Sequence, residues 1–255
     1  MKKILLLSAC LMTTSVQAWN CKFEKNIDQS LDLENTEQLL ILAAAGDLEV
    51  TGVKGSTVAS IKGRACASKT EWLEESSVET QGGSNAEIVV ELPDTGSSWS
   101  LIGQHYAYLD LVLEVPAGIA LNIKDSSGDV EIANVREVKI KDSSGDIEID
   151  DLERSVTVND SSGDIVLRDI GGDVTVDSDS SGDIRGADVE GFVLVKRDSS
   201  GDIRFRDVGE DFTVERDSSG DISANKVGGD FLVLRDGSGD INARKVSGEV
   251  SVPRG

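Results

Sequence analysis

One short motif recurs through the second half of this 255-residue chain at nearly constant intervals. Asp-Ser-Ser-Gly-Asp begins at Asp125, Asp142, Asp160, Asp179, Asp198 and Asp217, and the near-copy Asp-Gly-Ser-Gly-Asp begins at Asp236. The successive starts lie 17, 18, 19, 19, 19 and 19 residues apart. A fixed period of this size indicates a chain built from stacked structural repeats, in which each repeat packs against its neighbours.

Apolar residues keep the same offsets from the first Asp in the copies at Asp160, Asp198, Asp217 and Asp236, while the shorter early copies lose residues at corners. In the copy at Asp198 they are Ile203, Phe205, Val208, Phe212 and Val214. This alternation has a period of two, which predicts two short strands per repeat and excludes an α-helical solenoid. Stacked copies bury the apolar side chains by placing like residues about 4.8 Å apart. We therefore predict an all-β fold, a single-stranded parallel β-helix (β-solenoid) with about 17–19 residues per rung.

The repeat also divides the chain. Residues 125–255 should form seven regular rungs, whereas residues 19–124 carry only a degenerate pattern, as in Gly46-Asp47-Leu48-Glu49-Val50. A segment from about 68 to 104 interrupts that pattern, and we expect polar loops there. We predict that residues 19–124 form irregular rungs of the same solenoid and cap its open end, because an exposed strand edge invites aggregation.

The first residues have the composition of a secretory signal. Lys2 and Lys3 precede an apolar run from Ile4 to Met12, and Val16-Gln17-Ala18 suits cleavage after Ala18. We expect residues 1–18 to be removed and the protein to be exported to the periplasm, the cell surface or the medium. The alternative, acylation of Cys10 in a lipobox, would leave a signal of nine residues, which is shorter than the usual range. No later stretch approaches the roughly 20 apolar residues of a transmembrane helix.

Removal of the signal leaves two cysteines. In an oxidising compartment Cys21 and Cys66 are expected to form a disulfide, although two buried free thiols are the alternative. Such a bridge would stabilise the fold by about 4 kcal/mol through chain entropy. Two isolated cysteines and one distant histidine offer no zinc-ligand spacing.

The acidic balance restricts the partners. The chain has 25 Lys and Arg against 47 Asp and Glu, for a net charge of −22. A field of this sign repels phosphates, so nucleic acid is excluded as a partner.

The motif itself reads as a corner between strands. Asp and Ser side chains can bond backbone amides there, and Gly can supply a positive φ. Two columns of aspartate would repel each other, and calcium could bridge them; the candidate ligands are Asp198, Asp202, Asp217, Asp221, Asp236 and Asp240. The sequence also supplies local cations, at Arg185 and Arg204 and at Arg197, Arg216 and Arg235. We favour a hydrogen-bonded corner flanked by arginines, with no cofactor required.

Several of these motifs resemble one bacterial family. Gly46-Asp-Leu-Glu-Val, the run Leu113 to Gly118, and the Ser-Gly-Asp-Ile corners are similar to those of β-strand-repeat candidate adhesins, a domain family of unknown function. The resemblance covers most of the chain after the signal. It implies an exported β-helix and supplies no catalytic residues.

These observations favour a non-enzymatic adhesin or envelope scaffold that binds an envelope component or a surface glycan. The alternatives are a carbohydrate-binding or polysaccharide-cleaving β-helix protein, a calcium-binding repeat protein, and a periplasmic partner of a signalling system. The sugar-binding alternative predicts an exposed groove lined by Trp72, Trp99 and Tyr106. His105, near Tyr106 and Tyr108, is the one residue that could act as a base, and a surface role suits it better.

Overall fold

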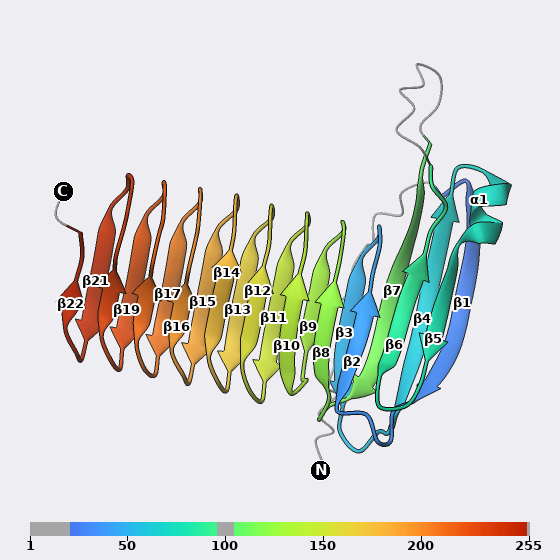
Figure 1. Cartoon of the computed structure of the whole chain (residues 1–255), viewed down its shortest axis with the longest axis horizontal. Coiled ribbons are helices and arrows are strands. Elements are labelled where there is room, and N and C mark those ends of the chain that lie inside the picture. The colour runs from blue at the N-terminus through green and yellow to red at the C-terminus, as the bar shows by residue number, and fades with distance from the viewer. Residues whose placement is uncertain (1–20, 96–104, 254–255) are drawn as a thin grey trace, which may run out of the picture.

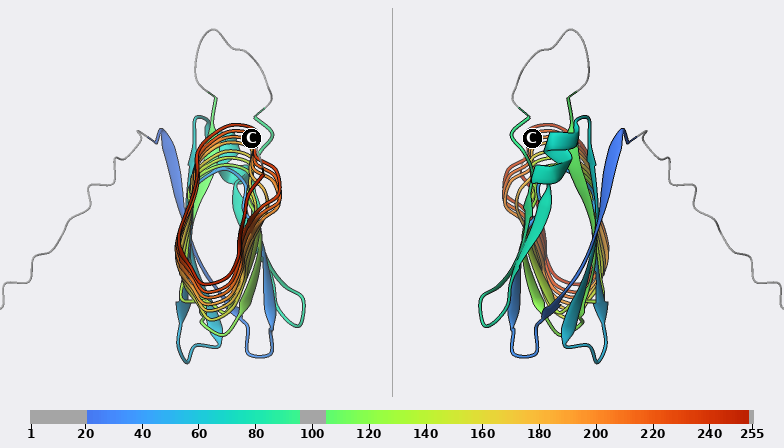
Figure 2. Two further views of the ribbon diagram at one scale, coloured as in Figure 1. Left: turned by 90° about the vertical axis from the view of Figure 1, so that its left-hand side faces the viewer. Right: turned by 90° about the vertical axis from the view of Figure 1, so that its right-hand side faces the viewer.

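The chain folds into a rod of stacked rungs. The computed structural model describes residues 21–95 and 105–253; the predicted signal with Cys10, and Trp99, lie outside them. Figure 1 shows the rod lengthwise, with β1 and α1 at one end and the C-terminal strand β22 at the other. Viewed along the axis, the rungs superpose as a flattened oval with one sheet on each long side (Figure 2). The all-β solenoid predicted from the repeat is therefore confirmed.

Each of the two sheets has 11 strands. In spatial order, the first sheet is β1 (Phe23–Asp32), β4 (Val58–Ala67), β7 (Ala107–Pro116), β3 (Leu48–Val53), β9 (Val130–Ala133), β11 (Ile147–Leu152), β13 (Ile165–Ile170), β15 (Ile184–Val189), β17 (Ile203–Val208), β19 (Ile222–Val227) and β21 (Ile241–Val246). The second is β5 (Ser77–Gln81), β6 (Ala86–Glu91), β2 (Gln38–Leu42), β8 (Ala120–Lys124), β10 (Glu137–Lys141), β12 (Val156–Asn159), β14 (Val174–Ser178), β16 (Val193–Val195), β18 (Phe212–Val214), β20 (Phe231–Val233) and β22 (Val250–Ser251).

The core lies between the sheets as one continuous cluster. Strands of successive repeats pair in parallel and in register, so that Ile184 faces Ile203 and Val189 faces Val208. The apolar side chains at these offsets are buried from Val130 to Val233, with Gly186 standing at one of the offsets; in the last rung Ile241, Ala243 and Val246 are only partly covered and Val250 and Val252 are exposed. The offsets read from the sequence therefore identify the core.

Neighbouring rungs also compensate for differences in side-chain size. The ring of Phe205 occupies the space beside Gly186, where an added Cβ would lie 2.0 Å from a ring carbon. Phe212 and Phe231 stack with ring centroids 5.2 Å apart. In the column of Gly186, Phe205 and Ala224 a large residue lies between two small ones, whereas Phe212 and Phe231 pack like on like; both arrangements keep the core filled.

The N-terminal end departs from the regular stack. β7 lies between β4 and β3 although it follows them in the chain. The pairs β1 with β4, β4 with β7, and β5 with β6 are antiparallel. The segment expected to hold polar loops instead forms α1 (Thr70–Glu75), β5 and β6. These elements close the first end of the rod with long strands.

A disulfide joins the segment just before β1 to β4 at this end. Cys21 and Cys66 are bonded, with their Cα atoms 5.6 Å apart, so the expected pairing is confirmed. Cys66 is fully buried and faces Tyr108 on β7. As for membrane crossing, none of the helical structure in the described ranges is long and apolar enough to span a bilayer.

Candidate functional site

The two aspartates of each corner have opposite environments. The first, at Asp125, Asp142, Asp160, Asp179, Asp198 and Asp217, is at most 6% exposed and points into the rod. The second forms the outer edge of the corner and is at least partly exposed in every rung. Sequence alone predicted two equivalent columns, and the structure separates them into an inner and an outer column.

The inner carboxylates from Asp142 to Asp217 are only half satisfied, and both oxygens of Asp125 are buried without a hydrogen-bond partner among the described residues. From Asp142 to Asp217, one oxygen accepts a backbone amide of its own corner, as from Ser143 to Asp142 at 2.6 Å and from Ser200 to Asp198 at 3.3 Å. The other oxygen is buried and has no hydrogen-bond partner among the residues that the structure describes. The predicted bond between corner Asp and backbone amide is therefore present from Asp142 to Asp217, but it leaves one carboxylate oxygen in each of these corners without compensation.

Burial and neighbouring carboxylates raise the pKa of this inner column. Loss of solvent, followed by repulsion from Asp179 and Asp217, raises the pKa of Asp198 to about 7. Burial is also the main cause of the raised pKa of Asp125, to about 7, and of Asp160, Asp179 and Asp217, each to about 6. A carboxyl with such a pKa is partly protonated near neutral pH, which relieves the repulsion along the column.

The outer aspartates form a hydrogen-bonded ladder. The backbone amide of each donates to Oδ1 of the aspartate in the preceding rung, as from Asp183 to Asp164 at 2.9 Å and from Asp221 to Asp202 at 2.7 Å. The ladder continues into the N-terminal half, where Asp129 donates to Asp47, and Asp47 to Asp110. Asp110 was not recognised from the sequence, because its strand enters the stack out of chain order.

One column of arginines pairs with this ladder. Arg185 lies 2.7 Å from Asp164 and also pairs with Asp183, while Arg204 lies 3.2 Å from Asp183 and pairs with Asp202. A backbone amide and Arg185 together lower the pKa of Asp164. These two arginines offset part of the negative charge of the ladder, at Asp164, Asp183 and Asp202.

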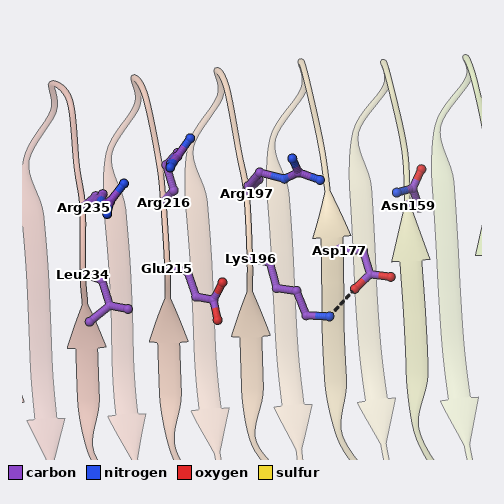
Figure 3. Close-up of a pocket in the computed structure, with 8 residues that line it drawn as sticks. All are labelled: Asn159, Asp177, Lys196, Arg197, Glu215, Arg216, Leu234 and Arg235. Carbon is purple, nitrogen blue, oxygen red and sulfur yellow. Dashed lines mark hydrogen bonds and ion pairs between the residues drawn. The ribbon is translucent and has the colours of Figure 1, made fainter.

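The other column lines a groove on the opposite side of the corner. Arg197, Arg216 and Arg235 each immediately precede an inner aspartate and are exposed. The groove has a volume of about 670 Å³ and is lined by Asn159, Asp177, Lys196, Arg197, Glu215, Arg216, Leu234 and Arg235. Figure 3 shows these side chains on successive rungs, with Lys196 turned toward Asp177, to which it is bonded at 2.6 Å. We call this feature the arginine groove.

The opposite turn of the rung carries a second groove of about 640 Å³. Its wall includes Asp151, Asp169, Asp188 and Asp207, which all have a positive φ. Arg206 pairs with Asp188 and Lys226 with Asp207. These positions lie near the ends of β11, β13, β15 and β17, and because Asp tolerates a left-handed backbone better than most residues, the conformation accounts for Asp there without a ligand.

The calcium candidates are dispersed between the two columns. Asp198, Asp217 and Asp236 belong to the inner column, while Asp202, Asp221 and Asp240 belong to the outer ladder. Within residues 21–95 and 105–253, no group of three or more His, Cys, Asp or Glu side chains has a metal-binding arrangement.

Of the aromatic residues singled out from the sequence, Trp72, Tyr106 and Tyr108 lie at the N-terminal end. Trp72 packs edge-on against exposed His105, with centroids 5.2 Å apart, and Lys69 lies over the Trp72 ring. Tyr106 contacts Tyr108 and accepts a hydrogen bond from the amide of Lys22. His105 therefore forms part of a surface contact with Trp72.

Comparison with known proteins gives a family. The family model described as Toastrack DUF4097 matches residues 11–185. No curated protein matches the chain.

Solved structures of candidate adhesion proteins are similar in fold. A candidate cell adhesion protein of Clostridium sporogenes is 16% identical, with a TM-score of 0.39 over 87% of this chain and 99% of that one. A candidate adhesin of Bacteroides fragilis is 13% identical, with a TM-score of 0.46 over 89% and 97%. A candidate adhesin of Parabacteroides merdae is 12% identical, with a TM-score of 0.40 over 90% and 97%.

Proposed function

The chain belongs to the toastrack family, and from this premise we propose that it is an exported, non-enzymatic rod that serves in adhesion or as a scaffold of the cell envelope. The observation that carries the proposal is the repetition of the outer surface. The same polar groups recur at the same place on successive rungs, as in the outer ladder from Asp110 to Asp240. A surface of this kind suits a partner that is itself extended and repetitive.

The placement of the carboxylates supports a role other than catalysis. General acid and base chemistry requires carboxyl groups that converge on one reacting bond. Here the inner carboxylates are covered by the core, and those of the outer ladder accept the amide of the next rung. A binding role would instead involve exposed polar side chains that take no part in the inner column or the outer ladder.

Gene deletion tests the proposal. We expect the mature protein to begin near Trp19, to fractionate with the periplasm, the outer surface or the medium, and to be required for surface attachment or envelope integrity. The measurements are mass spectrometry of the N-terminus, cell fractionation, and adhesion of deletion and complemented strains. Retention in the cytoplasm, or unchanged attachment and envelope integrity after deletion, would contradict the proposal.

A further inference from the structure

Some arginines of the rod form ion pairs with acidic side chains, and others do not. Arg168, Arg185 and Arg204 each pair with a carboxylate on the face of the first sheet. For Arg197, Arg216 and Arg235, the described part of the chain provides no ion pair and no side-chain hydrogen bond. Three exposed guanidinium groups therefore remain available on a protein whose net charge is strongly negative.

The backbone fixes the interval between these three side chains. The carbonyls of Arg197, Arg216 and Arg235 each accept the amide of the inner aspartate in the preceding rung, all at 2.9 Å. Successive side chains are consequently about 4.8 Å apart, the spacing of neighbouring strands. The groove crosses five rungs, from Asn159 to Arg235, which corresponds to about 19 Å along the rod.

The local charge of the groove is opposite to that of the whole protein. Its lining has four cations and two anions, and one cation, Lys196, already pairs with Asp177. Because the Debye length is about 8 Å at physiological ionic strength, a ligand in the groove experiences mainly these nearby charges. Guanidinium groups bind carboxylate and sulfate through paired hydrogen bonds, so the stripe suits an anionic ligand.

We propose that the arginine groove binds a linear anionic polysaccharide that carries carboxylate or sulfate groups along its length. A small anion could contact one or two of the arginines, whereas a polymer lying along the rod contacts all three. The stripe is one residue wide, which matches a chain better than a flat membrane. Its lining contains no aromatic side chain on which bases could stack, which separates it from single-stranded nucleic-acid sites. Leu234, 53% exposed, adds an apolar contact for the face of a sugar ring.

A pair of charge-matched variants tests this assignment. The groove variant combines Arg197→Gln, Arg216→Gln and Arg235→Gln; the control variant combines Arg168→Gln, Arg185→Gln and Arg204→Gln. Both lose three positive charges, so they are matched in net charge and differ in whether the arginines of the groove or the ion-paired arginines of the first sheet are removed. Calorimetry with polygalacturonate and with dextran sulfate, at low salt, measures the affinity, and thermal melting followed by circular dichroism verifies that both variants are folded.

We expect the wild-type protein to bind one or both anionic polysaccharides and the groove variant to bind about tenfold more weakly. The control should keep its affinity to within about twofold, since net charge alone acts through a screened field. The polymer that binds more tightly distinguishes carboxylate from sulfate as the recognised group. Neutral dextran should not bind.

The proposal is overturned if neither polysaccharide binds, or if both variants lose affinity equally, because net charge would then account for the binding. It is also overturned if polyglutamate or vesicles of anionic phospholipid bind as tightly through the same arginines. The proposal of a polysaccharide ligand rests on the proposed function, because an exported rod would meet such polymers at the cell envelope. If the polysaccharides fail to bind while gene deletion still impairs attachment, the ligand is wrong and the function stands.

Discussion

The two halves of the rod are stabilised in different ways. Residues 21–124 include long antiparallel strands, such as the ten-residue pair β1 and β4, and a disulfide. Residues 125–253 consist of short parallel strands, some of only three residues, joined by corners that hydrogen-bond from rung to rung. The N-terminal half depends on strand length and a covalent link, whereas the repeat depends on every corner adopting the same conformation.

The two ends of the rod also differ, in how well each covers the apolar core. The first end is closed by the strands β1, β4 and β5 and by α1, whereas the last rung leaves Val250 51% exposed and Val252 43% exposed. A unit in the middle of the repeat is stabilised from both sides. Damage to one corner should therefore disturb both neighbouring rungs, while damage to an isolated turn near the N-terminus should remain local.

The sharpest test of this contrast compares two glycines. Gly201 has a φ of +125°, and a Cβ there would lie 1.7 Å from the carbonyl oxygen of Gly182 in the preceding rung. Gly55 has a φ of +78°, and a Cβ there would meet no atom within 4 Å. We expect Gly201→Ala to destabilise the protein by about 4 kcal/mol or more, and Gly55→Ala by about 1 kcal/mol. Urea unfolding measures both, and equal losses would show that the corners are not interdependent.

Removal of the disulfide tests the N-terminal half. We expect Cys21→Ser combined with Cys66→Ser to lower the stability of that half by about 4 kcal/mol, because the bond closes a loop of 45 residues. Hydrogen exchange should locate the increased opening in β1 and β4, with the rungs after β13 unaffected. An equal rise in exchange along the whole rod would contradict independent stabilisation of the two halves.

The inner aspartates predict an unusual pH dependence of the repeat. Their pKa values in the folded state, about 6 to 7 at five positions, lie above the ordinary value near 4. Protonation therefore favours the folded state, and this stabilisation is fully present below about pH 4 and lost as the pH rises through 6 to 7. We expect the Tm to rise by several degrees between pH 8 and pH 5. A constant or falling Tm over that range would contradict the raised pKa values.

A single amide substitution should give the smallest effect and the most specific one. Asp198→Asn keeps an oxygen for the amide of Ser200 and removes a buried charge. We expect this change to stabilise the protein at pH 8 by about 1 kcal/mol and to have little effect at pH 5. Asp202→Asn, in the outer ladder, is the control and should be neutral or slightly destabilising, since it weakens the pair with Arg204. Stabilisation by both variants would point to net charge instead of burial.

The sequence pattern was sufficient to predict the fold of the repeat, because that fold depends on contacts within one rung and between adjacent rungs. The period gives the rung, the alternation gives the two strands, and the five offsets mark residues such as Phe212 and Ile222 that are fully buried. The pairing of Cys21 with Cys66 followed from the presence of only two cysteines after the predicted signal. The order of β7 between β4 and β3 could not be predicted, because it depends on contacts between distant segments.

The candidate site was only partly visible in the sequence for a similar reason. The motif shows two aspartates and nearby arginines, but it does not show which side of the corner each occupies. Asp198 and Asp202 lie four residues apart in the sequence, and the turn at Gly201 sends one into the core and the other to the surface. The same turn places Arg204 beside the outer ladder and Arg197 in the groove, where none of the acidic side chains that the structure describes forms an ion pair with it.

The sequence by itself determined the solenoid, its period and its core, because each of these depends on the spacing of apolar residues along one strand or between adjacent rungs. The tertiary structure decided which charges are buried, which are paired and which remain available. Charge environment depends on the direction of each side chain and on its neighbours in the stacked rungs, and it is fixed only when the corners close. The exposed arginine groove on an acidic rod follows from that closure.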